Sequence, residues 1–538
     1  MDQVRNLHWR REGYRPVETD VPELETSSPN LIHELKHVAS EFRHKVEEVK
    51  QVVSLKRELG LVSAMSYVVG SIIGSGIFIS PKGVLEHTGS SGFSLIVWSL
   101  CGLLALLGGL LYAELASTIP KSGGIYTYMN EFFGPLVAFV SLWSMFLGSP
   151  ASNAVLAQTG ATYVLQLFYG GCKPPGLSEQ LLALLFIASV FYFNYIGVRS
   201  GATFQVVTTV GKVLALAVII CVGFFHLIKG ETQNITMEGS RFNLGDLSLA
   251  FYIGMFAYSG WEVVVTAVEE IENPAKIVTQ ALIYGVLACV TVYILTNVAY
   301  YSVMSTQELL AAPAVAVLFG KKTMGVMHWI IPLFVSVSVI GGINSSVMSM
   351  SRYAYASSRE GHMPRFLSLI NVDKLTMKPA IFFSGLLSSL YVFVSGVYQL
   401  ITYLQFLFWL NNLLLVSGVL WWRYKYPEKN RPVKFPIILH IILFVLSALL
   451  LVMPFWTQPK MCLYGLFLAA MSLPCYAVFI MESKCRPAAF KALDNFNEWL
   501  NMCMQLIFAA TYEDEDVSNE MHTSMGTHPD EIHMEHLN

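Results

Sequence analysis

The sequence predicts an all-α membrane protein, and three observations support this prediction. Hydrophobic residues make up 54% of the 538 residues and charged residues only 13%, whereas soluble chains average about 25% charged. Apolar runs long enough to cross a bilayer, which takes about 20 residues, recur through most of the chain. Two of these runs are interrupted by glycine and serine near their centres. The formal net charge of −3 gives no indication of a nucleic-acid partner.

Twelve apolar runs are candidate membrane spans. The first begins at Leu61, after a polar and charged segment in which we find no signal peptide. The runs cover residues 61–86, 93–117, 131–167, 179–197, 202–229, 245–270, 276–304, 324–356, 379–397, 399–424, 434–454 and 461–482. Only Ser395-Gly396 separates the ninth run from the tenth. The third and eighth runs exceed what a bilayer needs, so tilted or extended helices are expected there.

The basic residues and the tails give an expected orientation and division of the chain. Most of the 34 Lys and Arg residues fall on the cytosolic side if both termini are cytosolic. We expect residues 1–55 to be a largely disordered tail, and 56–485 to be the twelve-span domain. Residues 486–510 read as an amphipathic helix at the inner membrane face, and 511–538 as an acidic, histidine-containing tail. No metal or cofactor site is expected.

The first span is interrupted at Gly74-Ser75-Gly76. Glycine costs about 1 kcal/mol in a helix interior, so this cluster suggests an unwound segment. Unwound backbone at membrane depth is tolerated only where it lines a cavity. The half-helix that follows would point its free amides at that cavity, which suits a carboxylate. Close helix packing through small residues is the alternative interpretation.

The sixth span holds a second candidate break at Phe256-Ala257-Tyr258-Ser259-Gly260-Trp261. Interrupted spans at corresponding positions of two halves point to a transporter binding site. The first and sixth spans are related as an inverted five-plus-five repeat requires. Free carbonyls from both breaks could bind an ammonium group.

Several motifs in order give the chain a family resemblance. They are GSGIFISPKGV at 74–84, YAELASTIPKSGG at 112–124, FAYSGW at 256–261, EEIENP at 269–274 and RYKYPEKNRPVKFP at 423–436. The chain resembles the amino acid–polyamine–organocation superfamily with its LeuT-type fold. More specifically it resembles the light chains of heteromeric amino-acid transporters, solute carrier family 7. The resemblance covers about residues 50–505.

The resemblance implies a set of substrate-binding residues. Amides of the Gly74-Ser75-Gly76 segment would bind the substrate carboxylate, chiefly those of Ser75 and Gly76. The amino group would be bound by carbonyls of Ile72, Phe256, Ala257 and Ser259. Phe256 is similarly placed to the family's outer gating aromatic residue. By weaker alignment, Ser152 and Trp409 would line the side-chain pocket.

Lys212 stands alone among apolar residues of the fifth span. An intramembrane lysine is costly and is expected to face a polar interior, although snorkelling to the interface is the alternative. It matches the family lysine that replaces a sodium site by tethering spans one and eight. The resemblance therefore implies sodium-independent transport.

Two loop positions are candidates for covalent modification. Cys172 lies in the loop after the third span, which the topology places outside, and matches the family's site for a disulfide to a single-span heavy-chain glycoprotein of solute carrier family 3. A free thiol is the alternative. Asn234-Ile235-Thr236 is an N-glycosylation sequon in an outward loop, although family light chains are usually unglycosylated.

Two positions depart from the family pattern. Ser149 stands where arginine is common, and the loss of this cation weakens the case for acidic substrates. Glu262 stands where a neutral residue is usual. It either faces the pocket, where it would favour polar or cationic side chains, or faces a neighbouring helix.

Charged residues gather at the inner ends of several spans and could form a gate of ion pairs that break and remake during alternating access. They are Glu114, Lys121, Glu269, Glu270, Arg352 and Arg359. A solvated structural face is the alternative interpretation.

These observations together predict a sodium-independent exchanger of neutral or broad-range L-amino acids in the plasma membrane, acting as the light chain of a heterodimer. Sodium- or proton-coupled symport and a non-transporting amino-acid receptor are the alternatives. No metalloprotease motif or nucleophile elbow lies in any span, so an enzyme is not expected.

Overall fold

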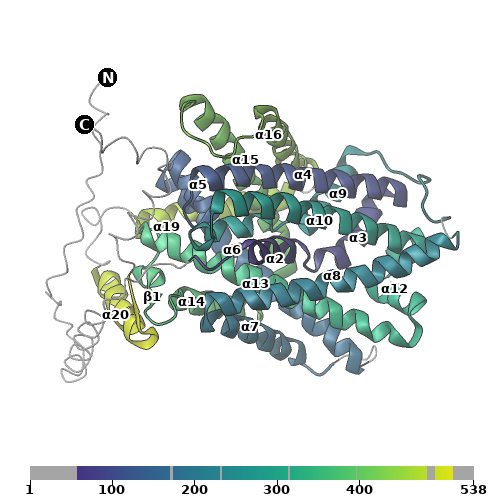
Figure 1. Ribbon diagram of the computed structural model, residues 1–538, viewed down its shortest axis with the longest axis horizontal. Helices are drawn as coiled ribbons and strands as arrows, with labels where there is room; N and C mark the ends of the chain where they lie inside the picture. The colour runs from purple at the N-terminus through teal and green to yellow at the C-terminus, as the bar shows by residue number, and fades with distance from the viewer. Residues whose placement is uncertain are drawn as a thin grey trace, which may run out of the picture.

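The computed structural model describes residues 57–169, 174–230, 233–312, 315–394, 397–457, 459–480 and 491–512. In this part of the chain, long helices run side by side along the longest axis of the molecule (Figure 1). A single two-stranded ribbon is the only sheet among the described residues. The all-helical prediction is therefore confirmed, apart from this small ribbon.

Helices occupy the positions of all twelve predicted runs. In order they are α2 (Leu61–Ile72) with α3 (Gly76–Thr88), α4 (Ser91–Thr118), α6 (Pro135–Tyr169), α7 (Ser178–Ile196), α8 (Val198–Ile228), α9 (Leu244–Tyr258) with η1 (Trp261–Glu270), α10 (Pro274–Val303), α13 (Ile330–Arg359), α14 (Lys378–Tyr391), α15 (Val397–Lys425), α16 (Ile437–Val452), and α18 (Pro459–Ala470) with α19 (Ser472–Phe479). Shorter elements between them are α5 (Gly124–Phe133), α11 (Thr306–Ala311), α12 (Val315–Thr323), η2 (Gly325–Trp329), η3 (Arg365–Ser368) and α17 (Pro454–Thr457).

Length and apolar composition alone identify seven helices in the described segments that could cross a membrane. The bent pair α2 and α3 makes an eighth. Many apolar side chains on these helices face outward; Leu181 on α7 and Val207 on α8 are 63% and 65% exposed. Such exposure recurs on many of the helices and suits a lipid environment, because soluble proteins rarely expose extensive apolar surface.

The first span is surrounded by other helices. Helix α2 packs against α8, α10 and α13, while α3 packs against α9 and α4. Because α2 is enclosed, seven of its twelve residues are buried, including the polar Ser66 and the small Gly70. The break between α2 and α3 therefore lies inside the bundle.

One end of the bundle carries a cap made of the chain's last described helix, α20 (Lys491–Phe508), and the ribbon (Figure 1). Strand β1 (Ile370–Asn371) pairs antiparallel with β2 (Ala510–Thr511). Asn371 Nδ2 also donates hydrogen bonds to the carbonyls of Phe508 and Ala509, over 2.7 and 3.1 Å. One face of α20 thus packs on the α13–α14 connection.

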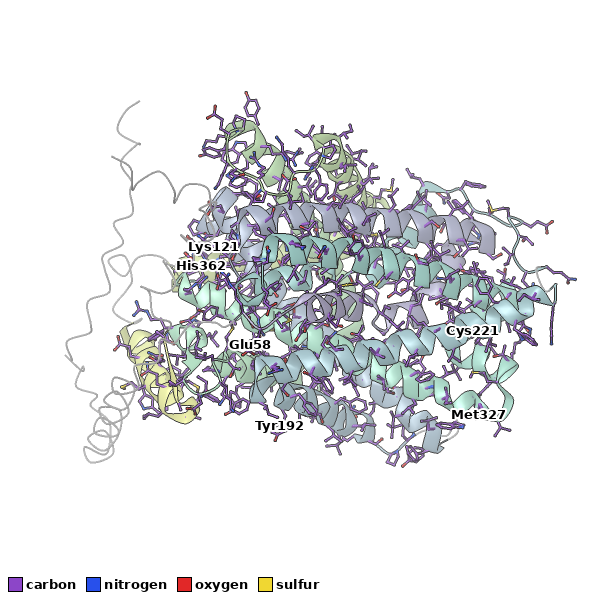
Figure 2. All side chains as sticks on the ribbon, viewed as in Figure 1. Glu58, Lys121, Tyr192, Cys221, Met327 and His362 are labelled. Carbon is purple, nitrogen blue, oxygen red and sulfur yellow. The ribbon has the colours of Figure 1, made fainter. Side chains whose placement is uncertain are left out.

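Exposed aromatic side chains cover another face of α20. Phe496 and Trp499 are 53% and 40% exposed, and their rings stack with centroids 5.9 Å apart. We call the end that carries α20 the inner end, following the predicted orientation. Figure 2 shows Lys121 and His362 toward this end, and Cys221 and Met327 toward the opposite one.

Candidate functional site at two broken helices

The first span is broken where the sequence predicts it. Helix α2 ends at Ile72, α3 begins at Gly76, and the two axes differ by 40°. The Gly74 N–H donates to the Ile72 carbonyl over 2.8 Å, which closes a tight turn. The amides of a helix's first turn have no carbonyl in a preceding turn of the same helix. Ser75, which is 4% exposed, and Gly76 therefore present the positive end of α3 to the buried break.

The sixth span is broken as well. Helix α9 ends at Tyr258 and the 3₁₀ helix η1 begins at Trp261. Gly260 joins them with φ of 113°, a left-handed conformation that other residues adopt only with strain. The Ser259 N–H and hydroxyl both donate to the Phe256 carbonyl, over 3.3 and 2.7 Å. This carbonyl is therefore turned back into the break.

The two breaks lie against each other. A Cβ placed at Gly76 would lie 2.6 Å from Ala257 Cα, and one placed at Gly260 would lie 2.8 Å from Ser71 Cβ. Contacts this short leave no room for any side chain, so both glycines are required by the crossing of the backbones. The backbone groups assigned to the substrate's carboxylate and amino group thus belong to one compact site.

Tyr293 of α10 holds the two breaks together, and the sequence analysis missed it. Its hydroxyl lies 2.6 Å from the Ile72 carbonyl and 3.1 Å from the Ala257 carbonyl. Its ring contacts those of Trp98 and Tyr258, with centroids 5.7 and 5.0 Å away. The hydroxyl therefore orients two of the carbonyls expected to bind an ammonium group, and each carbonyl oxygen keeps a second lone pair. No spacing in the sequence distinguishes this tyrosine from the others in apolar runs.

Ser338 of α13 is a second contact that the sequence analysis missed. Its hydroxyl lies 3.2 Å from the Ile73 carbonyl and 3.1 Å from the Gly74 carbonyl. The unwound backbone that α2 and α3 leave unpaired is thus satisfied by neighbouring helices, as a membrane interior requires.

Lys212 of α8 is fully buried and donates from Nζ to the Gly70 carbonyl over 2.5 Å. A Cβ at Gly341 of α13 would lie 2.7 Å from Lys212 Cε. The ammonium group therefore lies between α2 and α13, which are the first and eighth predicted spans. This geometry excludes snorkelling to the interface.

The three candidate pocket side chains lie on different helices. Glu262 is partly buried and accepts a hydrogen bond from the Gly260 N–H over 3.2 Å. Trp409 of α15 is 2% exposed. Its neighbour Phe408 contacts the Trp261 ring with centroids 6.3 Å apart. Ser152 lies partly buried on α6.

Ion pairs and a backbone bridge join the inner ends of several helices. Arg352 of α13 binds Glu270 through two hydrogen bonds of 2.7 and 2.6 Å, and both side chains are buried. Leu59, just before α2, forms a parallel bridge with Ile271, just after η1. The first and sixth spans are therefore fastened to each other and to α13 at this end.

A second pair reinforces the same region. Arg359 of α13 lies 3.0 Å from Glu269, whose carboxylate also accepts the Ser122 N–H over 2.9 Å. Lys121 is partly buried in the turn between α4 and α5. Four of the six predicted gate residues thus meet at the end of η1.

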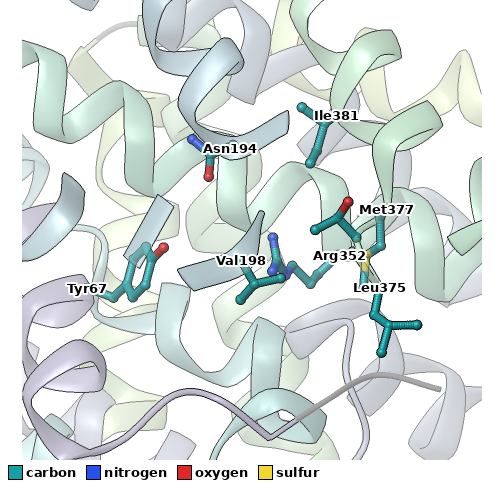
Figure 3. Close-up of a pocket in the computed structure, with 8 residues that line it drawn as sticks. Tyr67, Asn194, Val198, Arg352, Leu375, Met377 and Ile381 are labelled. Atoms are coloured by element: carbon teal, nitrogen blue, oxygen red, sulfur yellow. The ribbon is translucent and has the colours of Figure 1, made fainter. Parts of the chain in front are cut away.

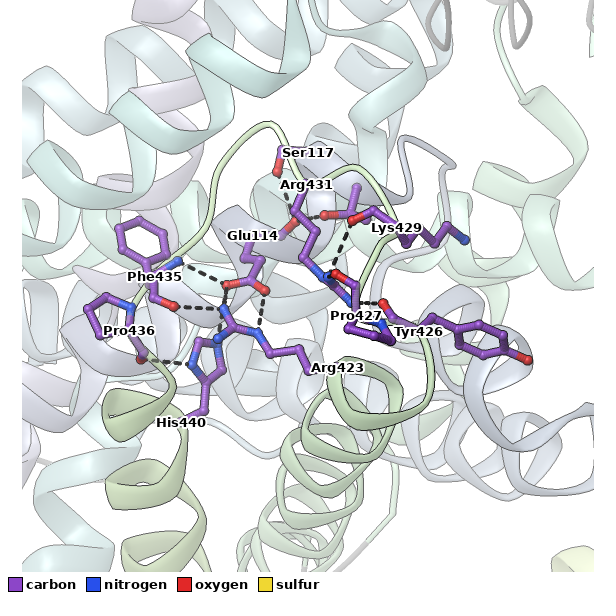
Figure 4. Close-up of polar contacts among 11 residues, drawn as sticks. Glu114, Ser117, Arg423, Tyr426, Pro427, Lys429, Arg431, Phe435, Pro436 and His440 are labelled. Carbon is purple, nitrogen blue, oxygen red and sulfur yellow. Dashed lines mark hydrogen bonds and ion pairs between the residues drawn. The ribbon is translucent and has the colours of Figure 1, made fainter.

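Glu114 belongs to a separate cluster. It accepts two hydrogen bonds from the Arg423 guanidinium of α15, one of them over 2.8 Å, and a third from the Phe435 N–H over 3.2 Å (Figure 4). His440 Nε2 lies 3.5 Å from the same carboxylate. Glu114 therefore joins α4 to the α15–α16 connection, while the other pairs lie at the end of η1.

A small pocket opens beside Arg352, the partner of Glu270 (Figure 3). Its lining residues are Tyr67, Asn194, Val198, Arg352, Leu375, Thr376, Met377 and Ile381. Four of them are polar, and they come from α2, α7, α13 and the connection before α14. The pocket therefore places Arg352 next to polar residues at the inner half of the first span.

Of the two predicted modification positions, the structure describes Asn234 but not Cys172. Cys172 lies outside the described residues. Asn234 lies in the connection between α8 and α9, and its carbonyl accepts a hydrogen bond from Ser91 over 2.6 Å. Asn344-Ser345-Ser346 also fits the sequon pattern, but Asn344 is fully buried in α13.

Two broken helices in contact inside a bundle of long apolar helices define the class of this protein: a multi-span membrane protein with a LeuT-type fold. Comparison with known proteins identifies the family. The amino acid permease family matches residues 59–479. The chain belongs to this family.

Named relatives resemble the chain over most of its length. The large neutral amino acids transporter small subunit 2 of Oryctolagus cuniculus is 40% identical over 470 residues, 86% of this chain and 87% of the relative. The cystine/glutamate transporter of Homo sapiens is 38% identical, covering 87% and 93%. The Asc-type amino acid transporter 1 of Mus musculus is 37% identical, covering 86% and 89%.

Proposed function

We propose that this protein exchanges neutral or broad-range L-amino acids across the plasma membrane by alternating access. The contact between the two broken helices supports this most directly. The amides at the start of α3 suit a carboxylate, while carbonyls of Ile72, Phe256, Ala257 and Ser259 suit an ammonium group. Every L-amino acid carries a carboxylate and an amino group on one α-carbon, so a site of this kind would bind the part that all of them share.

Counterflow in proteoliposomes tests this proposal. Vesicles loaded with one unlabelled L-amino acid should accumulate the same labelled amino acid transiently, and a panel of unlabelled competitors should reveal the range accepted. Gly260→Ala should abolish uptake, because the new Cβ would overlap Ser71. Binding of labelled amino acid without counterflow would favour a receptor and overturn the proposal.

Transport is proposed to be independent of sodium, because the Lys212 ammonium already supplies a cation between α2 and α13. Replacing sodium by choline should leave the exchange rate unchanged. A strict requirement for sodium, or acceleration by an imposed proton gradient, would show symport instead.

The protein is further proposed to be the light chain of a heterodimer with both termini in the cytosol. The names of relatives include the term small subunit, and Cys172 is proposed to form the disulfide with a single-span heavy-chain glycoprotein. Non-reducing electrophoresis of membranes from cells expressing both chains should show a heavy species that Cys172→Ser removes. Cys221→Ser is the control, because Cys221 lies on an exposed face of α8. A heavy species that persists in Cys172→Ser contradicts this bridge.

A further inference from the structure

Helix α8 carries a buried polar stripe that continues inward from Lys212. Gln205, Thr208, Thr209 and Lys212 are at most 6% exposed. Their spacing places them on one face of the helix, while Val207, Val210 and Leu214 on the opposite face are more than half exposed. A polar stripe facing the interior of a membrane bundle is expensive unless each group has a partner.

Three side chains of this stripe bind the backbone of α2. The Gln205 amide and the Thr209 hydroxyl both donate to the Ser66 carbonyl, over 3.2 and 3.0 Å. One turn closer to the break, Lys212 donates to the Gly70 carbonyl. The stripe therefore grips α2 over its inner half, and Lys212 is only its last member.

Gln205 also connects α2 to α13 and α7. Its Nε2 donates to the Ser345 hydroxyl over 2.8 Å, and its Oε1 accepts from Asn344 Nδ2 over 2.6 Å. The side-chain oxygen Oδ1 of Asn344 in turn accepts from Asn194 Nδ2 over 2.6 Å. These side chains are buried. This series of hydrogen bonds ends at Asn194, which lines the same small pocket as Arg352.

Two glycines show how closely the helices must approach. A Cβ at Gly70 of α2 would overlap Gln205 Nε2 and Thr209 Oγ1. A Cβ at Gly341 of α13 would lie 2.7 Å from both Thr208 Oγ1 and Lys212 Cε. The polar face of α8 thus packs between α2 and α13, and only glycine at these two positions leaves room for its side chains.

We propose that Gln205 is a positioning residue that latches the inner half of α2 to α8 and α13 while the inner end is closed. Its amide bonds α2 on one side and α13 on the other, so any movement of α2 away from α13 must break one of these contacts. A buried amide holds its partners only in a fixed geometry and loses them when water enters. The latch therefore lies between the substrate site and the Glu270–Arg352 pair, and sets how readily the inner half of α2 is released.

Hydrogen exchange of the full chain in lipid nanodiscs tests this latch, because it reads the opening of α2 directly. Gln205→Leu should raise the exchange rate of amides in residues 61–72 by about tenfold, with α4 and α10 unchanged. Gln158→Leu is the matched control. Gln158 likewise donates to a backbone carbonyl, that of Val392, over 2.8 Å, but this bond joins α6 to the end of α14 rather than to α2.

A second variant keeps the test decisive where Gln205→Leu folds poorly. Gly70→Ala should also accelerate exchange in residues 61–72, because its Cβ displaces the Gln205 amide. Gly70→Ala combined with Gln205→Leu should accelerate exchange little more than Gly70→Ala alone, since both substitutions break the same contact between Gln205 and α2. Wild-type exchange in Gln205→Leu, or acceleration spread equally over α4 and α10, would overturn the latch.

The latch as a control of transport rests on the proposed function, and a separate readout keeps the two apart. In proteoliposomes, Gln205→Leu should raise the external half-saturation concentration several-fold and lower the internal one, because inward-open states become more populated. A wild type that does not exchange amino acids would overturn the proposed function. The hydrogen-exchange rates of the α2 amides would still decide whether Gln205 acts as a latch.

Discussion

The buried pair between Arg352 and Glu270 offers the sharpest test of how the inner end closes. Arg352→Gln keeps a polar side chain but removes both charged hydrogen bonds, of 2.7 and 2.6 Å, to the Glu270 carboxylate. These side chains are only 6% and 1% exposed. The carboxylate is thereby left unpaired in the closed state, whereas opening of the inner end hydrates it.

The size of the effect follows from this burial. Removing one partner of a buried ion pair costs about 3–5 kcal/mol, and every 1.4 kcal/mol changes an equilibrium constant about tenfold. Loss of about 3 kcal/mol from the closed state alone therefore shifts the ratio of inner-closed to inner-open forms by about a hundredfold. Arg359→Gln breaks the neighbouring pair with Glu269, but Arg359 is 27% exposed. Water screens this pair, so about 1 kcal/mol or less is expected.

The assay compares half-saturation concentrations on the two sides of oriented proteoliposomes, using an amino acid that the counterflow panel identifies. Arg352→Gln should raise the external half-saturation concentration and lower the internal one. The ratio of the external to the internal value should increase by one to two orders of magnitude. Arg359→Gln should change the same ratio less than about fivefold. Equal ratios in the two variants would refute the reasoning, because burial would then not decide which pair closes the inner end.

Three further predictions concern separate parts of the molecule. Tyr293→Phe should weaken substrate binding by about three- to tenfold in competition assays, because the Ile72 and Ala257 carbonyls lose the hydroxyl that orients them. Burial lowers the pKa of His362, whose ring is hydrogen-bonded to the Tyr126 hydroxyl over 2.7 Å. Because the unfolded chain then binds a proton more readily than the folded one, the melting temperature should fall as the pH drops below about 6.5. His362→Gln should flatten this dependence. Asn371→Ala should destabilise the α20 cap by about 1–3 kcal/mol, measurable as faster proteolysis after Phe508.

The two breaks were predictable because glycine has a local cost. A helix that contains Gly74, Gly76 and a serine between them is weakened whatever surrounds it. The same argument applies to Gly260, which follows a serine in the corresponding span. Its φ of 113°, by contrast, could not be read from the local sequence. Lys212 was predictable for a related reason, since an isolated charge among apolar residues must find a polar partner.

The partners of these features could not be read from the sequence. Tyr293 and Ser338 lie in apolar runs that contain other tyrosines and serines, and only the packing of α10 and α13 brings their hydroxyls to the broken backbone. Asn371 pairs with a segment more than 130 residues later in the chain. Long-range contacts of this kind depend on which helix faces meet, and apolar periodicity in a bilayer leaves those faces nearly indistinguishable.

The separation of Glu114 from the other charged inner residues bears on which ion pairs can act as a gate. Its carboxylate also accepts from the backbone of Phe435, so its hydrogen bonds tie α4 to the connection between α15 and α16 rather than to α2 or η1. Arg352, by contrast, binds Glu270 at the end of η1, where the segment leading into α2 is also fastened. Of the Glu114–Arg423 and Arg352–Glu270 pairs, only the Arg352–Glu270 pair must break when the inner ends of the first and sixth spans move away from α13. Charge at the end of a span is therefore not enough to mark a gate, and the helices that a pair connects decide its role.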